Sequence, residues 1–166
     1  MSDADGLTSF QEALQTVDET LSSVQLPAET VPVREAAGRV LRCDQVSRLD
    51  LPPFDKSAMD GYAILAGDER SEYRLLETVA AGQVGSARLV PGTAVKVMTG
   101  SPVPEGTGKV IMIEDTRMEG DIVHVLQHRD AQNVCPRGED VRVGDIVLRA
   151  GTTLTALDIA NVVSVS

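Results

Sequence analysis

The sequence is poor in aromatic residues, which limits the ligands that the protein can bind. Its 166 residues include no Trp and only two Phe and two Tyr. Proteins that bind single-stranded nucleic acid stack the bases on aromatic side chains. Clustered positive charge is missing too, because 15 Lys and Arg are scattered among 25 Asp and Glu, for a formal charge of −10. Since a duplex-binding surface needs clustered basic residues, we expect no nucleic-acid partner.

Long apolar runs and an export signal are also missing from the sequence. No apolar run approaches the roughly 20 residues that a membrane span requires, and the start, MSDADGLTSF, lacks the basic and apolar segments of a signal peptide. We therefore expect a cytoplasmic protein with no membrane partner. The two cysteines, Cys43 and Cys135, are far apart in the sequence. A disulfide between them stays open, but two reduced thiols fit a chain without an export signal better.

Apolar periodicity predicts a helix over residues 8–24. Its apolar residues recur every three or four positions, and Ser9 with Glu12 forms a capping-box pattern. This stripe either packs against the protein's own sheet, which we expect, or forms an interface. A second capping box, Thr155 with Asp158, opens a helix in the last segment, and a short helix is expected over residues 34–39.

The middle of the chain is predicted to be rich in β-strands. Short β-branched segments alternate with glycine-containing turns such as PGT, MEGD and RAGT. The expected strands are residues 62–66, 72–81, 94–98, 109–115, 122–127 and 146–149. Short strands with such punctuation are typical of a barrel or sandwich. The predicted fold class is therefore α+β, mostly β.

The segment LPPFDKSAMDGYAI, residues 51–64, carries more polar groups than a turn requires. An Asp-Gly turn accounts for Asp60, and Asp55 is a candidate cap for the turn that follows it. A turn does not account for Asp55, Ser57 and Asp60 together. Neighbouring carboxylates repel one another unless a cation or hydrogen-bond donors offset the charge. Hard oxygen ligands of this kind suit Mg²⁺, often together with substrate phosphates.

Two further segments carry candidate functional groups. In KVMTGSPVPEG, residues 96–106, a strand ends in hydroxyl residues that either bind an oxyanion or simply form a turn. In NVCPRGEDVRVGD, residues 133–145, Arg137 is expected to pair with Glu139 or Asp140 in a charged loop. His124 and His128 share a predicted strand face, but with no third ligand nearby they make a poor metal site.

These three segments, in this order, resemble the N-terminal half of the molybdopterin molybdenumtransferases, whose animal counterpart is the E domain of gephyrin. The resemblance rests on DLPPFDKSAMDGYAI, on VKVMTGSPVPEG with KVIMIEDT, and on RGEDV with GDIVLRAGTTLTALDIANVVSV. It covers nearly the whole chain. It implies a two-domain region, in which a barrel-like β domain, about residues 51–135, is inserted into a smaller mixed α/β domain of residues 7–50 and 136–166.

The resemblance also implies an activity and partners. Enzymes of this family insert molybdenum from molybdate into adenylylated molybdopterin, with Mg²⁺ assistance and release of AMP. They are elongated homodimers with the active site at the dimer interface, and the molybdopterin adenylyltransferase is a further expected partner. The family continues into a pterin-binding α/β domain that is absent from these 166 residues, so the fragment by itself is expected to be inactive.

Site residues follow from matching the family's motifs to this sequence. The expected catalytic residues are Asp60, Thr99 and Asp140; the expected substrate-binding residues are Ser57, Ser101, Arg137 and Glu139; the expected metal ligands are Asp60, Asp55 and Glu114. Their roles would be electrostatic: to hold Mg²⁺ or molybdate and to orient the phosphate leaving group. Cys135-Pro136 departs from the basic residues often found before RGED. Two alternatives stay open, a non-catalytic dimerisation or scaffolding module of the gephyrin type and a β-rich binding domain that keeps the motifs only for folding.

Overall fold

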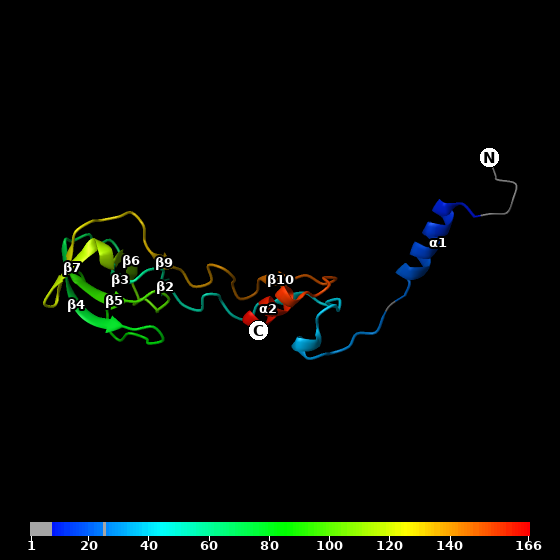
Figure 1. Ribbon diagram of the computed structural model, residues 1–166, viewed down its shortest axis with the longest axis horizontal. Coiled ribbons are helices and arrows are strands. Elements are labelled where there is room, and N and C mark those ends of the chain that lie inside the picture. Colours follow the sequence, from blue (N-terminus) through cyan, green and yellow to red (C-terminus); the bar gives the residue numbers. More distant parts are fainter. Residues whose placement is uncertain (1–7, 25) are drawn as a thin grey trace. The chain divides into compact units, whose positions relative to one another are not determined.

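The computed structural model describes residues 8–24 and 26–166, which divide into two units after Ala36 (Figure 1). The first unit contains α1 (Phe10–Ser22) and a 3-10 turn, η1 (Val33–Glu35). The Ser9–Glu12 capping box is confirmed: the Ser9 hydroxyl accepts the Glu12 N–H, and the Glu12 carboxylate accepts the Ser9 N–H. The helix expected over residues 34–39 is wrong, because only the short η1 forms there.

The apolar stripe of α1 buries no side chain. Phe10, for example, is 76% exposed. The expected packing of this stripe against a sheet therefore stays a prediction.

A curled six-stranded sheet carries the buried apolar clusters of the second unit, Ala37–Ser166 (Figure 1). In spatial order it contains β6 (Thr107–Met112), β3 (Gly61–Leu65), β5 (Thr93–Val97), β4 (Glu72–Val79), β8 (Ile122–Val125) and β7 (Thr116–Glu119). Neighbouring strands are antiparallel except for β4 and β5. The mostly β, barrel-like architecture expected from the sequence is confirmed, and β7, which the pattern of the sequence did not predict, completes one edge.

Both faces of this sheet are buried, which fixes the register of its strands. Alternate residues of β3 point to opposite sides: Tyr62 and Ile64 belong to one apolar cluster, and Ala63 belongs to the other. Because side chains alternate along a strand, a shift of one residue would exchange the two clusters. The absence of Trp thus leaves a core built mainly of Val, Ile and Ala, with the two tyrosines as its largest buried side chains.

Two small antiparallel sheets flank the six-stranded sheet in the sequence. The inner one pairs β2 (Lys56–Ser57) with β9 (Val134–Cys135), and the outer one pairs β1 (Gln45–Val46) with β10 (Ile146–Leu148). The last helix, α2 (Ala156–Ser164), begins at the predicted Thr155–Asp158 capping box. This nested pairing brings residues before the six-stranded sheet together with residues after it. The predicted domain boundaries at residues 51 and 135 stay a prediction.

Three smaller expectations can be compared with the structure. Cys43 and Cys135 are both free thiols, as predicted. His124 lies in β8 and contacts the carboxylates of Glu72 and Glu119, whereas His128 follows the end of that strand. Within residues 8–24 and 26–166, no helix is long and apolar enough to cross a membrane.

The buried hydroxyl of Tyr73 allows a test of the barrel. Tyr73 is 1% exposed, and its hydroxyl donates to the Asp68 carbonyl at 2.8 Å and accepts the Arg70 N–H at 2.7 Å. Because Tyr73→Phe leaves both backbone groups without this partner, we expect unfolding to become easier by about 1–2 kcal/mol in urea denaturation. Tyr62→Phe is the matched control, since Tyr62 is equally buried and makes no side-chain hydrogen bond among the described residues. Equal losses in the two variants would contradict the prediction.

Candidate functional site

The loop before β3 and the loop after β5 meet at Asp60. The Asp60 carboxylate accepts two hydrogen bonds from Thr99, one from the backbone N–H and one from the hydroxyl, each 2.7 Å long. The sheet produces this contact, because Gly61 lies opposite Val97 in the β3–β5 pairing. Asp60 and Thr99, predicted together as catalytic residues, are therefore adjacent although 39 positions separate them.

The Asp60 carboxylate is held in its ionised form. The two hydrogen bonds from Thr99, with a smaller contribution from the positive charge of Lys96, keep the pKa of Asp60 below its ordinary value of 3.8. Asp60 is half-buried and Thr99 is exposed, so the group remains accessible. A fixed, accessible negative charge suits the binding of a cation or the orientation of a hydrogen-bond donor.

Ser57 and Ser101 are buried beneath the surface of these two loops and hydrogen-bond to their backbone. Ser57 is 1% exposed and Ser101 is fully buried. The Ser57 hydroxyl donates to the Met59 carbonyl, and the Ser101 hydroxyl donates to the Met98 carbonyl. The Ser57 backbone N–H also donates to the Ser101 carbonyl at 2.9 Å. The structure thus gives both predicted substrate-binding serines a bracing role, and a substrate contact through either hydroxyl would require the loops to open.

The RGED loop, residues 137–140, packs against the beginning of the first motif segment, residues 51–64. The Gly138 N–H donates to the Pro52 carbonyl and the Asp140 N–H donates to the Leu51 carbonyl, each at 2.9 Å. The Asp140 and Glu139 side chains are exposed. Asp140, the third predicted catalytic residue, therefore belongs to a loop that is fixed by its backbone and presents its carboxylates to solvent.

Arg137 pairs with a residue that the sequence did not indicate. Its Nε donates to the Asp50 carboxylate, and its backbone N–H donates to the Asp55 carboxylate at 2.7 Å. The predicted pairing of Arg137 with Glu139 or Asp140 is wrong, because the fold places the Asp50 carboxylate against the guanidinium instead. The hydrogen bonds from Val143 and Arg137 also lower the pKa of Asp50. No local spacing could have revealed this pair, which is separated by 87 positions.

The first segment therefore connects the other two. Its beginning, Leu51 to Asp55, holds the RGED loop, and its end, Ser57 to Asp60, holds the MTGS loop. Between these halves, β2 pairs with β9, with Lys56 opposite Cys135. Two of the polar side chains in residues 51–64, those of Asp55 and Asp60, thus bind other loops, whereas the Ser57 hydroxyl bonds within the segment itself.

The three predicted metal ligands are not gathered in the structure. Among the described residues, no group of three or more His, Cys, Asp or Glu side chains is placed to hold a metal ion. The Asp55 carboxylate accepts the backbone N–H of Arg137. The negative charge of Glu114 contributes to raising the pKa of Arg129. Asp60 and Glu114 both remain accessible, and the assignment of any of the three carboxylates to Mg²⁺ stays a prediction.

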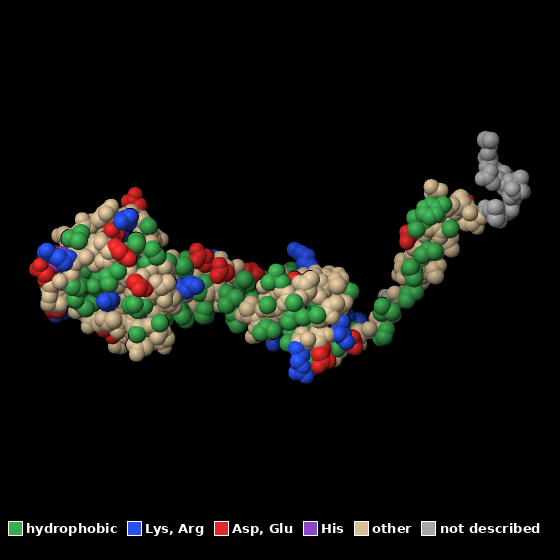
Figure 2. Space-filling view, viewed as in Figure 1, with side chains coloured by type: hydrophobic (Ala, Val, Ile, Leu, Met, Phe, Trp, Pro, Cys, Tyr) green, Lys and Arg blue, Asp and Glu red, His purple; other side chains and the backbone are tan. Residues whose placement is uncertain are grey.

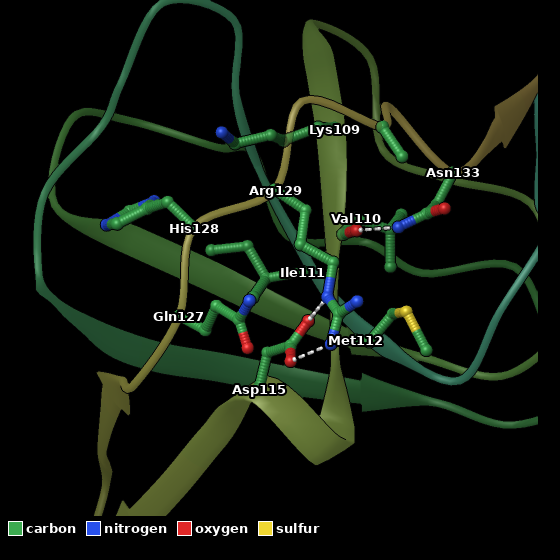
Figure 3. Close-up of a pocket in the computed structure, with 10 residues that line it drawn as sticks. Lys109, Val110, Ile111, Met112, Asp115, Gln127, His128, Arg129 and Asn133 are labelled. Atoms are coloured by element: carbon green, nitrogen blue, oxygen red, sulfur yellow. Dashed lines mark hydrogen bonds and ion pairs between the residues drawn. The ribbon is translucent and has the colours of Figure 1, made fainter.

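A small cavity beside β6 is lined in part by an ion pair (Figure 3). Arg129 donates to both carboxylate oxygens of Asp115, at 2.6 and 2.8 Å, and Figure 3 shows the two side chains in direct contact. This contact lowers the pKa of Asp115. With about 10 Å³ of internal space, the cavity holds no more than about one water molecule. The pair therefore tethers the loop after β8 and forms no substrate site.

Basic side chains do not form a patch on the face shown in Figure 2. Lys and Arg are dispersed there among acidic and apolar side chains. The absence of a nucleic-acid partner, expected from the composition, stays a prediction.

The hydrogen bond from the Thr99 hydroxyl can be tested by titration. Thr99→Val removes the hydroxyl but keeps the backbone bond, so we expect the pKa of Asp60 to rise toward 3.8. A lowered pKa adds stability above pH 3.8 that is lost as the pH falls through the folded-state pKa, and the variant should lose part of it at neutral pH. Carbon-13 NMR of the carboxylate measures the change. Thr116→Val, whose hydroxyl bonds only the Ile113 carbonyl, should leave Asp60 unchanged; an equal shift there would contradict the prediction.

Solved structures with the same architecture belong to proteins of molybdopterin biosynthesis. A Pyrococcus horikoshii OT3 structure described as a molybdopterin biosynthesis moeA protein matches 82% of this chain and 38% of its own, with a TM-score of 0.74 and 44% identity. A second structure described in the same terms, from the organism spelled Pyrococcus horikosii, matches 92% of this chain and 42% of its own, with a TM-score of 0.79 and 25% identity. The fold and its loops thus define a class of molybdenum cofactor biosynthesis proteins.

The chain belongs to the family described as MoeA N-terminal region (domain I and II), which residues 8–166 match. Its relatives include the molybdopterin molybdenumtransferases of Haemophilus influenzae, 36% identical over 156 residues, and of Staphylococcus aureus strain Mu50, 32% identical over 152 residues. Each match covers 87% of this chain, but only 38% and 36% of those two proteins. The chain therefore spans less than two fifths of the length of these two relatives.

Proposed function

We propose that this chain is the N-terminal part of a molybdopterin molybdenumtransferase. Such an enzyme inserts molybdenum from molybdate into adenylylated molybdopterin and releases AMP. The observation that carries the proposal is the Asp60–Thr99 contact, in which two separate motifs of the family form one accessible, ionised group. Family membership over residues 8–166 supports it.

Each loop has a separate role in this proposal. Asp60 supplies a fixed negative charge, and Thr99 keeps that charge in place through two donors. Asp140 adds a second exposed carboxylate on the RGED loop. Mg²⁺, when bound with the substrate's phosphate, would offset the charge on the leaving group. Asp60 is its proposed protein ligand, and the remaining ligands would be phosphate oxygens and water.

The chain supplies only part of the active site in this proposal. A pterin-binding domain provides the remainder, and the site forms in a cytoplasmic homodimer where this region of one subunit faces that domain of the other. The chain by itself is accordingly proposed to be inactive. The molybdopterin adenylyltransferase remains a proposed partner.

Complementation tests this function. The chain is joined to the part of the Haemophilus influenzae relative that it does not match, and the fusion is expressed in cells that lack the transferase. We expect molybdenum-enzyme activity to return with the fusion but not with the chain alone. A fusion that folds and dimerises without restoring activity would contradict the proposal and would favour the scaffolding alternative.

A further inference from the structure

Asp50 lies directly before the first motif and holds the loop that follows β9. One carboxylate oxygen accepts the Arg137 Nε–H, and the other accepts the Val143 N–H at 2.8 Å. The Asp50 side chain is only 16% exposed, whereas that of Arg137 is 63% exposed. One carboxylate therefore grips the RGED segment on both sides from a sheltered position.

The way Arg137 is held leaves most of its guanidinium available. Its Nε is bonded to Asp50, but neither Nη makes a hydrogen bond to any part of the chain that the structure describes. The two Nη groups lie at the outer end of an exposed side chain. A guanidinium offers parallel N–H donors that match two oxygens of a phosphate or similar oxyanion. Pairing through Nε fixes the orientation of this group without using those donors.

The backbone around Arg137 is fixed as well. The Arg137 N–H bonds the Asp55 carboxylate, and Gly138, with φ +68°, takes a left-handed turn that brings its N–H to the Pro52 carbonyl. Gly138 is buried, and a Cβ there would come within 3.1 Å of the Arg142 side chain. The Arg137 guanidinium is therefore fixed through both its backbone and its Nε before any ligand binds. Because less conformational freedom is lost on binding, the entropic cost of binding is smaller.

We propose that Asp50 is a positioning residue that orients Arg137, and that the two Nη groups of Arg137 bind a tetrahedral oxyanion, either phosphate or molybdate. This inference rests on the proposed function, in which both substrates carry such a group; it adds Asp50 to that site and specifies which atoms of Arg137 contact the oxyanion. Glu139 and Asp140 are exposed in the same loop. Their negative charge opposes the binding of an isolated oxyanion, so the titration must extend to high anion concentration.

Anion titration of the 166-residue chain tests the proposal. Inorganic phosphate, and in a separate series molybdate, is added at constant ionic strength while nitrogen-15 NMR follows the Arg137 Nε–H. We expect saturable shifts with at least one anion, and the difference between the two series identifies the anion that the site prefers. In Asp50→Asn we expect the Nε–H signal to broaden and the Kd to rise about tenfold. Unchanged binding in this folded variant, or no saturable shift with either anion, would overturn the proposal.

Two further variants complete the design. Asp44→Asn is the matched control, because the Asp44 carboxylate also accepts a single distant backbone N–H, that of Ala150 at 2.7 Å, but does not contact Arg137; its anion affinity should be unchanged. If Asp50→Asn fails to fold, Arg137→Lys decides, with binding followed through the Gly138 amide in this variant and in the unmodified chain. Arg137→Lys keeps the positive charge but lacks the two parallel Nη donors, so the Kd for the anion should rise about tenfold. A Kd equal to that of the unmodified chain would overturn the proposal. These readouts do not depend on activity, so their failure is distinguishable from failure of the complementation test.

Discussion

Asp60→Ala is expected, under the proposed function, to lower the rate of molybdenum insertion by about 100-fold or more in the fusion of this chain with the unmatched part of the Haemophilus influenzae relative. Mutations that remove one preorganised electrostatic contact from a transition state typically cost two to three orders of magnitude. The Asp60 carboxylate is fixed by two 2.7 Å hydrogen bonds from Thr99 and remains accessible, so its loss removes charge from the site and leaves no buried group unpaired. The measurement is AMP release from adenylylated molybdopterin in the presence of molybdate and Mg²⁺.

The control for this variant is Asp121→Ala. Asp121 is an exposed carboxylate in the turn between β7 and β8, and its side chain makes no hydrogen bond to the described part of the chain. It should retain the rate of the unmodified enzyme. Thermal unfolding of both variants separates lost activity from lost structure. Full activity of Asp60→Ala, with an intact dimer, would show that the Asp60–Thr99 contact is structural and would favour a scaffolding role.

Gly61→Ala is expected to destabilise the barrel by about 3 kcal/mol, a large fraction of a typical domain's stability. Gly61 lies between β5 and β6 at the start of β3, where it pairs with both Val97 and Met112. A Cβ at this position would lie 2.1 Å from the Ile111 carbonyl oxygen and 2.8 Å from the Val110 side chain. Because the nearest atom is backbone, relief requires β3 and β6 to move apart. Urea denaturation followed by circular dichroism measures the loss.

Gly120→Ala serves as the comparison for this prediction. Gly120 has φ +63° in the turn before β8, and a Cβ there would meet no atom within 4 Å. Its cost is therefore the left-handed backbone alone, about 1–2 kcal/mol. If the two glycine variants lost equal stability, the close approach of β3 and β6 at Gly61 would not be the cause.

The position of Gly61 also links stability to the proposed site. Gly61 directly follows Asp60, whose carbonyl accepts the Ile113 N–H at 3.1 Å. A displacement of β3 from β6 at Gly61 would therefore also shift Asp60 relative to Thr99, which follows β5. A partly folded Gly61→Ala protein should for this reason also show a higher pKa of Asp60, nearer to 3.8.

Sequence patterns alone predicted much of the local structure. The Ser9–Glu12 and Thr155–Asp158 pairs predicted two helix starts, and β-branched segments predicted six of the strands. These succeed because capping and side-chain alternation depend on neighbours within four residues. The three motifs likewise identified the loops that the structure brings to residues 51–64. Short strands such as β2 and β9, with two residues each, carry too little pattern to predict.

Only the tertiary structure decided which groups are engaged and which remain available. It placed the Ser57 and Ser101 hydroxyls inside the protein, left Asp60 accessible, and paired Arg137 with Asp50 and not with its neighbours in the loop. Each outcome depends on contacts between residues about 40 to 90 positions apart, which the register of the sheets sets. Local spacing contains no record of that register, so the sequence could name the polar residues but could not assign their partners.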